Sequence, residues 1–307
     1  MRTDAAAMTT QKVLRLQPRE NFVLTPFIEG VCRRATTYLS AGYACHFRGS
    51  AGTGKTTLAM HVAHERGRPV MLMFGDEEFG SSDLVGAEKG LHSTKVIDNF
   101  VRSVTKTEEF RRPQWVDSRL TTACKHGYTL VYDEFSRSRP EANNVLLTIL
   151  EEGILALPDT HFGVTYTPVH PEFRAIFTSN PEDYAGVHKT QNALLDRMIT
   201  IELDYCDRET EVAITRARAA IDGDSAEKIV ALVRRVRAEG NRPQRPTLRA
   251  SIMIARIARQ LGCAVSLDDP VFVNLCADVL HSEAVAAHHG ERAAAAGATR
   301  NTILSIR

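Results

Sequence analysis

The run Gly49-Ser-Ala-Gly-Thr-Gly54-Lys55-Thr56 constrains the fold of this 307-residue chain more than any other feature. Glycines let a backbone curl until several N–H groups point at one anion, and a helix that starts there adds the positive end of its dipole. The run follows the apolar segment 44–48 and precedes a helical pattern in which Leu58, Val62 and Ala63 share one face. This order of strand, glycine-rich turn and helix predicts a phosphate-binding P-loop.

Each residue type in a P-loop has a defined role. The lysine reaches the β- and γ-phosphates of a nucleotide, and the hydroxyl group that follows it is a ligand of Mg²⁺. We therefore expect ATP and Mg²⁺ as cofactors, with Lys55 on phosphate and Thr56 on the metal. The loop residues expected to bind nucleotide are Gly49, Ser50, Ala51, Gly52, Thr53, Gly54, Lys55 and Thr56.

Two acidic residues end a second apolar segment, Thr129-Leu-Val-Tyr132. A P-loop needs a carboxylate on a neighbouring strand to hold Mg²⁺ and its water shell, and Asp133 is placed for that role. Glu134 is then expected to polarise the attacking water as general base, which predicts hydrolysis of ATP. A solvated Asp-Glu pair at the end of a strand is the alternative interpretation.

Two further polar residues stand at the ends of later apolar segments. Asn180 ends the strand pattern 173–178 and is expected to face the γ-phosphate as a sensor; an Asn-Pro turn is the alternative. Arg197 precedes the strand pattern 198–203 and is expected to stabilise transition-state charge in a neighbouring subunit. The alternative for Arg197 is an ordinary surface arginine.

The order of patterns along the chain predicts an α/β fold. Strands are expected at 44–48, 69–74, 130–132, 173–178 and 198–203, with helical patterns between them, which is typical of a parallel sheet flanked by helices. An N-terminal helix is expected over 27–40. From residue 207 onward we expect only helices, at about 208–221, 225–239, 247–261 and 269–287. The predicted organisation is an arm (1–20), an α/β domain (21–206), a helical domain (207–289) and a tail (290–307).

Composition excludes several classes of protein. Lys and Arg total 38 and Asp and Glu total 37, so the net charge of +1 predicts neither nucleic acid nor a membrane surface as partner. No apolar stretch approaches the length of a membrane helix, and residues 1–15 lack the apolar block of a secretory signal. The six cysteines form no CxxC pair, so we expect isolated thiols in a cytoplasmic protein.

One segment departs from this balance. Residues 234–259 contain eight arginines and one acid, Glu239, a local charge of +7. A solvated charged face, a phosphate contact from the helical domain and a nucleic-acid patch are the three interpretations. The segment has no Tyr, Phe or Trp, which removes the stacking partners of a single-strand binder. Arg249 opens a patterned helix, where one arginine would meet nucleotide.

Taken in order, these motifs resemble those of the AAA+ P-loop NTPases. The segment Asp83-Leu-Val-Gly86, the insertion that continues to about Arg119 and a hairpin pattern over 153–166 resemble the MoxR-like branch, which carries a helix-2 insert and a hairpin at these places. Longer strings beginning at Asp133, Phe173 and Tyr184 are similar to the gas-vesicle protein N family. The resemblance covers about residues 20 to 285.

The resemblance implies a role for each matched residue. It implies that Gly49 to Thr56 and Asp133 bind nucleotide and metal, that Glu134 is catalytic and that Asn180 is sensor 1. It further implies that Arg197 is the arginine finger and Arg249 the sensor 2 residue of a helical lid subdomain. Arg137 and Arg139 lie in a segment that often faces an adjacent subunit, so the finger stays open among these arginines.

The family implies a ring, commonly a hexamer, that helps to build gas vesicles. Its partners would be copies of itself and gas-vesicle structural and accessory proteins, in the cytoplasm or on the vesicle. We expect an Mg²⁺-dependent ATPase that remodels or loads vesicle proteins, with the insert and the hairpin transmitting motion to the client. The alternatives are a MoxR-type activator of a metalloenzyme, a non-catalytic accessory component of the vesicle and a nucleic-acid motor.

Overall fold

The computed structural model describes residues 22–98, 106–159, 163–181, 188, 192–238 and 245–285. By internal contacts the chain divides into two compact units. The first, here called the sheet unit, comprises the described residues within 35–48 and 59–201; the second, the lid unit, comprises those within 22–34, 49–58 and 202–285. The predicted arm (1–20) and tail (290–307) lie outside the described residues, and the predicted domain boundaries stay predictions.

Five strands of the described chain form one sheet in the order β2-β5-β8-β1-β9. The pairs β2–β5, β5–β8 and β8–β1 are parallel, as predicted, so the carboxyl ends of these strands share one edge. Each predicted strand is present within one or two residues of its expected bounds. The strands are β1 (Ala44–Gly49), β2 (Val70–Phe74), β5 (Thr129–Asp133), β8 (Arg174–Ser179) and β9 (Met198–Leu203).

Helices lie before and between the strands, and several of them contribute apolar residues, such as Leu120 and Leu146, to the same core as the strands. The central strands are buried along their length, and Phe135, Phe177 and Tyr132 lie among the largest fully buried side chains. Burying one such side chain contributes about 1.5–3 kcal/mol. These helices are α2 (Pro26–Ser40), α3 (Lys55–Glu65), α4 (Ser81–Val85), α5 (Arg119–His126), α6 (Pro140–Asn143), α7 (Val145–Glu151) and α8 (Asn192–Leu195), with a 3₁₀ turn at Phe135–Arg137.

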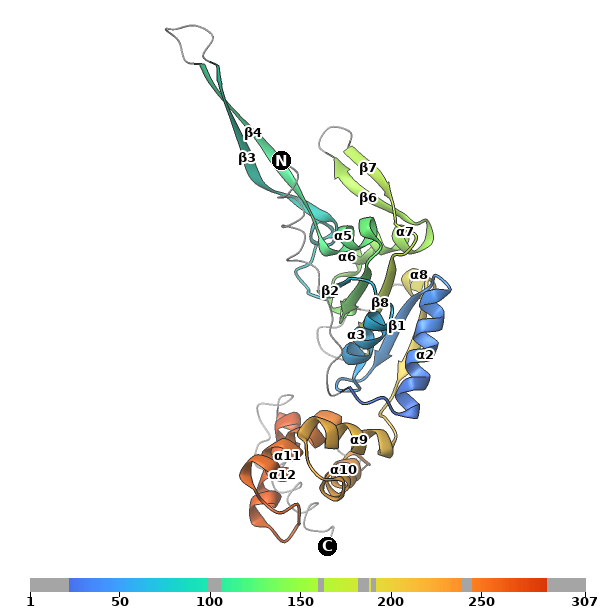
Figure 1. Cartoon of the computed structure of the whole chain (residues 1–307), viewed down its shortest axis with the longest axis vertical. Helices are drawn as coiled ribbons and strands as arrows, with labels where there is room; N and C mark the ends of the chain where they lie inside the picture. The colour runs from blue at the N-terminus through green and yellow to red at the C-terminus, as the bar shows by residue number, and fades with distance from the viewer. Residues whose placement is uncertain are drawn as a thin grey trace. The chain divides into compact units, whose positions relative to one another are not determined.

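Two antiparallel hairpins are inserted between these elements (Figure 1). The hairpin predicted over 153–166 is confirmed as β6 (Ile154–Asp159) paired with β7 (Gly163–Pro168). The insertion after α4 is a long ribbon of β3 (Gly86–Asp98) and β4 (Lys106–Asp117). We expected helices between the strands of the sheet. For this insertion that prediction is wrong, because the insertion forms two strands.

The lid unit contains four long helices, as the sequence predicts. In the described chain from residue 207 onward every regular element is a helix: α9 (Arg208–Ala219), α10 (Gly223–Ala238), α11 (Leu248–Leu261) and α12 (Pro270–Val285). Their apolar faces form one core around Ile229, Val233 and Ile254. Thr247 caps the start of α11 and Gly262 ends it with φ of 63°. None of the helices in the described chain has the length and apolar content to span a bilayer.

Candidate functional site

The P-loop begins where β1 ends and leads into α3. Gly52 and Gly54 have φ of 79° and 89°, in the left-handed region that costs glycine little. The Thr53 hydroxyl donates to the Ser50 carbonyl at 2.9 Å and closes the turn. The loop therefore has the backbone conformation that its glycines predict.

Lys55 lies at the first position of α3 and is only 7% exposed. Its ammonium group donates to the carbonyl oxygens of Gly49 and Ser50 at 2.7 and 2.8 Å, so it lies over the start of the loop. Thr56 follows it and is half-buried. The N-terminus of α3 adds its free N–H groups and the positive end of its dipole, which favours an anion here.

Within the lid unit, the P-loop lies against the beginning of α11. A Cβ placed on Gly52 would come within 2.4 Å of the Thr247 hydroxyl oxygen, and one placed on Gly49 within 2.1 Å of the Leu203 carbonyl oxygen. No side chain fits at either glycine. Arg249 is exposed on the first turn of the same helix, so the structure places the predicted lid arginine on an element that contacts the P-loop.

The acidic pair stands at the carboxyl end of β5 in the sheet unit. Asp133 is 6% exposed, and its carboxylate accepts a hydrogen bond from the Thr178 hydroxyl at 2.5 Å. Glu134 has φ of 52°, a left-handed conformation that costs a residue with a Cβ about 1–2 kcal/mol. Its carboxylate is 38% exposed and pairs with Arg137 at 2.9 Å. The turn thus points one carboxylate inward and keeps the other accessible.

The next strand of the sheet, β8, contributes a second group of polar residues. Thr178, Ser179 and Asn180 are all buried at its carboxyl end. The Ser179 hydroxyl lies 2.8 Å from His46 Nε2, and His46 Nδ1 lies 3.0 Å from the Thr200 hydroxyl. His46 thus bonds through both ring nitrogens and ties β1 to β8 and β9.

These polar residues share one edge of the sheet. The parallel pairing places the ends of β5 and β8 side by side and the end of β1 next to β8. The P-loop starts at the end of β1, while Asp133 and Asn180 stand at the ends of the other two strands. Ligands of open parallel sheets bind outside the carboxyl ends of the strands.

The three arginines that the sequence offers as candidates for the arginine finger differ in their contacts in the structure. Arg197 pairs with the carboxylate of Glu151, with 2.7 Å from Nε to Oε2, and also donates to a carbonyl of α8. Arg137 pairs with Glu134 within the turn after β5. Arg139 is exposed directly before α6. Arg197 and Arg137 thus contact groups of their own chain.

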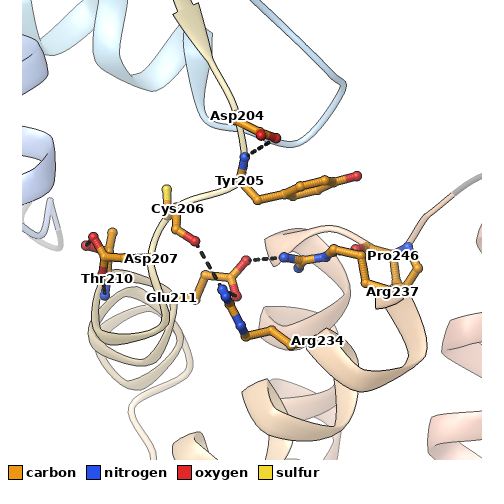
Figure 2. A network of polar contacts seen from close by, with 9 residues as sticks. All are labelled: Asp204, Tyr205, Cys206, Asp207, Thr210, Glu211, Arg234, Arg237 and Pro246. Atoms are coloured by element: carbon orange, nitrogen blue, oxygen red, sulfur yellow. Dashed lines mark hydrogen bonds and ion pairs between the residues drawn. The ribbon is translucent and has the colours of Figure 1, made fainter. Parts of the chain in front are cut away.

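A buried charge cluster joins the linker after β9 to the lid helices (Figure 2). Glu211 is 1% exposed, and its carboxylate accepts from Arg234 at 2.9 Å and from Arg237 at 2.8 Å. Arg237 also donates to the Pro246 carbonyl at 2.7 Å and lies 4.1 Å from the centre of the Tyr205 ring. Arg234 donates to a carbonyl of the linker, that of Cys206. We call these residues the Glu211 cluster.

Two more arginines of the arginine-rich segment bind the chain's own backbone. Arg256 and Arg259, both on α11, donate to the carbonyls of Arg218 and Ala219 at the end of α9. Together with Arg234 and Arg237, four of the eight arginines between 234 and 259 therefore have internal partners. Glu239 and Arg242 lie outside the described residues.

All six cysteines are unpaired with one another, as predicted. Burial raises the pKa of the thiols of Cys124 and Cys276 to about 12. Burial, with the carboxylates of Glu211 and Asp207, raises the pKa of the Cys206 thiol to about 11. A thiolate nucleophile at these three positions is disfavoured near neutral pH.

Sequence reasoning missed three buried residues that organise the site and the lid: Thr178, His46 and Glu211. A partial signal existed for Thr178, because it lies two residues before Asn180 on an expected neighbour of the acidic strand. The register pairs Tyr132 with Phe177, so the next residues along the two strands are Asp133 and Thr178. Nothing local in the sequence marks His46 or Glu211, since their partners are far away in the chain.

Comparison with known proteins is consistent with this fold. Residues 47–198 match the model of the AAA domain, dynein-related subfamily. A mutant of Thermotoga maritima RuvB superposes with a TM-score of 0.52 at 16% identity, covering 87% of this chain and 73% of that one. At this identity the likeness shows the fold alone.

Two sequence relatives are much closer. The gas vesicle ATPase GvpN of Ancylobacter aquaticus is 53% identical over 93% of this chain and 80% of that protein. The GvpN of Haloferax mediterranei is 45% identical over 89% of this chain and 78% of that protein. The chain therefore belongs to the GvpN family of gas vesicle ATPases, and it is an AAA ATPase.

Proposed function

We propose that this ATPase binds Mg²⁺ and ATP at the carboxyl edge of its sheet and uses hydrolysis to remodel or load structural proteins during gas-vesicle assembly. The observation that carries the proposal is the combination, in a member of this family, of a P-loop at the end of β1 with Asp133 and Glu134 at the end of β5. Lys55, Thr56 and the loop backbone would hold the phosphates.

The residues present fit Mg²⁺ better than a metal held by protein alone. In the part of the chain that the structure describes, no three His, Cys, Asp or Glu side chains form a cluster that would hold a metal ion. Mg²⁺ is usually held by one or two carboxylates together with phosphates and water. Asp133 and Thr56 would hold it here, and the bound ion would neutralise phosphate charge.

Glu134 is the residue we assign to activation of water. A general base must reach the proton that it accepts, and the partly exposed carboxylate of Glu134 meets that condition. Asp133 beside it is more buried and accepts from the Thr178 hydroxyl, which suits a carboxylate that is held in place to bind the metal. Asn180 would orient water or phosphate from the end of β8, and Arg249 would contact nucleotide from the start of α11.

Ring assembly is part of the proposal because, in AAA ATPases, the nucleotide binds between adjacent subunits of a ring. The partner would be a second copy of the chain, in a ring that we expect to be a hexamer. Arg197, Arg137 and Arg139 are the candidates for the arginine that reaches the neighbour's nucleotide. Arg139 has the exposed position that such a role needs, whereas Arg197 would first have to leave Glu151.

The β3–β4 ribbon and the β6–β7 hairpin are the proposed client-facing elements. On β7, Val164 and Tyr166 are 50% and 71% exposed, so this hairpin offers accessible apolar surface to a client. The clients would be vesicle structural and accessory proteins, and the ATPase would act in the cytoplasm or on the vesicle surface.

The test is vesicle formation in cells in which the gene is replaced by variants. Lys55→Ala and Glu134→Gln should both abolish vesicles while the proteins accumulate at wild-type levels. The matched control is Glu227→Gln on the exposed face of α10, which should leave vesicles normal. Normal vesicles with Glu134→Gln, but none after deletion, would instead support a non-catalytic accessory role.

A further inference from the structure

We propose that Thr178 is a positioning residue for ATP hydrolysis, which orients the metal-binding Asp133 and the general base Glu134 through one hydroxyl group. This inference rests on the function proposed above. Thr178 is fully buried on β8. Its hydroxyl donates to Asp133 Oδ1 at 2.5 Å and accepts from the Glu134 backbone N–H at 2.9 Å.

A threonine hydroxyl suits this double contact. It has one donor and two acceptor lone pairs, so it can serve a carboxylate and an N–H group at once. The bond to Asp133 fixes the direction of one carboxylate oxygen. The bond to Glu134 holds the backbone of the following residue, so a single group on β8 fixes the Asp133 carboxylate and the backbone from which the Glu134 side chain projects.

The turn at Glu134 needs such support because its backbone is in a left-handed conformation, with φ of 52°. A second contact holds the other side of the turn: a Cβ placed on Gly75 would come within 2.0 Å of the Glu134 carbonyl oxygen. The Gly75 N–H also donates to the Asp133 carbonyl at 2.8 Å. The turn is therefore fixed between β2 and β8, with Thr178 as the side-chain contact.

Thr129 offers a matched control in the same sheet. It is fully buried on β5, and within the described residues its hydroxyl has no hydrogen-bond partner. Thr178→Val and Thr129→Val remove the same atom from buried strands, but only the first removes a contact with the acidic pair. Thr178→Ser keeps the hydroxyl and loses a methyl group.

The experiment measures ATP hydrolysis and the binding of a fluorescent ATP analogue, each with Mg²⁺ and with EDTA. For Thr178→Val we expect kcat to fall about 10- to 100-fold, the usual cost of losing a group that orients a ligand. The Mg²⁺ concentration for half-maximal binding should rise, with nucleotide binding in EDTA unchanged. Thr178→Ser should recover most of the activity, and Thr129→Val should resemble wild type.

Three results would overturn the proposal: wild-type kcat in Thr178→Val, equal losses in Thr178→Ser and Thr178→Val, or an equal loss in Thr129→Val. If Thr178→Val does not fold, Thr178→Ala is judged by the same criteria. Glu134→Gln separates this inference from the proposed function. Wild-type hydrolysis in Glu134→Gln would remove the function on which the inference rests. An inactive Glu134→Gln beside a fully active Thr178→Val would refute only the role of Thr178.

Discussion

Two buried carboxylates, Asp133 in the sheet unit and Glu211 in the lid unit, lie in very different surroundings. The Glu211 carboxylate accepts from two guanidinium groups, which supply opposite charge on its own chain. The Asp133 carboxylate accepts from the hydroxyl of Thr178, at the sheet edge that carries the candidate site. Burial alone therefore does not identify a functional acid, because the Glu211 carboxylate is at least as buried as Asp133 and lies among arginines of the lid helices.

The difference separates structural from catalytic use of the same chemical group. Charged partners compensate for the cost of removing an ion from water, so a cluster such as that of Glu211 is suited to hold a linker and helices together. The hydroxyl contact of Asp133 fixes the direction of one carboxylate oxygen at the end of β5, where we propose the metal site. The comparison predicts that Asp133 variants lose chemistry, whereas Glu211 variants lose stability.

The largest effect is expected for Asp133→Asn. The substitution keeps the shape and removes the charge, so hydrolysis of ATP should fall at least ~10²-fold, because charge stabilisation by a bound metal is worth several kcal/mol. Steady-state ATPase rates test this, with unfolding in urea measured in parallel. Wild-type turnover would show that Asp133 is no more functional than Glu211.

Glu211→Gln should give the opposite result. It leaves two guanidinium groups, one of them nearly buried, without a counter-charge, which should lower the free energy of unfolding by about 3–5 kcal/mol. The control is Glu227→Gln, which removes an exposed pair with Arg208 and should cost no more than about 1 kcal/mol. Equal unfolding midpoints for the two variants would contradict the structural role of the Glu211 cluster.

Alkaline pH should lower the free energy of unfolding, because both units bury groups whose pKa is raised. Burial raises the pKa of Tyr132 and of Cys124, in the sheet unit, and of Cys276, in the lid unit, to about 12. Above their ordinary pKa values of 10.0 and 9.0, the unfolded chain loses these protons while the folded chain keeps them. The free energy of unfolding should therefore fall as the pH rises from about 9 towards about 12.

Urea unfolding at a series of pH values measures this decline. The decline should be shallower for Tyr132→Phe, which removes one of the titrating groups. A stability that stays constant over this range would refute the assignment of these groups as buried and neutral.

The smallest effect is expected for Arg256→Met at the contact between α11 and α9. Arg256 donates to the Arg218 carbonyl at 3.0 Å near the end of α9, and a cation at this end of a helix is worth about 0.3–1 kcal/mol. Methionine keeps the unbranched apolar stem and removes the charge. Thermal unfolding should show a decrease of a few degrees or less, and a decrease as large as that of Glu211→Gln would place Arg256 in the lid core.

Local sequence patterns predicted most elements of the fold. The apolar face of α2, with Ile28, Val31, Ala35 and Leu39, is buried as the helical period requires. The P-loop and the acids after β5 were found because each motif combines residue types with a strand or helix beside it. Such signals lie within about ten residues of one another, so they can be read without an alignment.

Interactions between distant residues could not be predicted in this way. The β3–β4 ribbon pairs backbone positions that are distant in sequence, such as 95 with 109, and strand preference reflects the partner strand more than the local sequence. No local pattern predicts the pair of Arg197 with Glu151, which are distant in sequence. The expected action of Arg197 on a neighbouring subunit stays a prediction. The different roles of Asp133 and Glu211 likewise could not be predicted from the sequence, because they depend on which distant residues each carboxylate contacts.

The most direct test of the central claim is the rate of ATP hydrolysis by purified Glu134→Gln. If the carboxyl edge of the sheet is the hydrolytic site and Glu134 its base, turnover should fall about 10²- to 10⁴-fold while ATP binding is retained. Turnover equal to that of the wild type, with the same ATP affinity, would contradict the account.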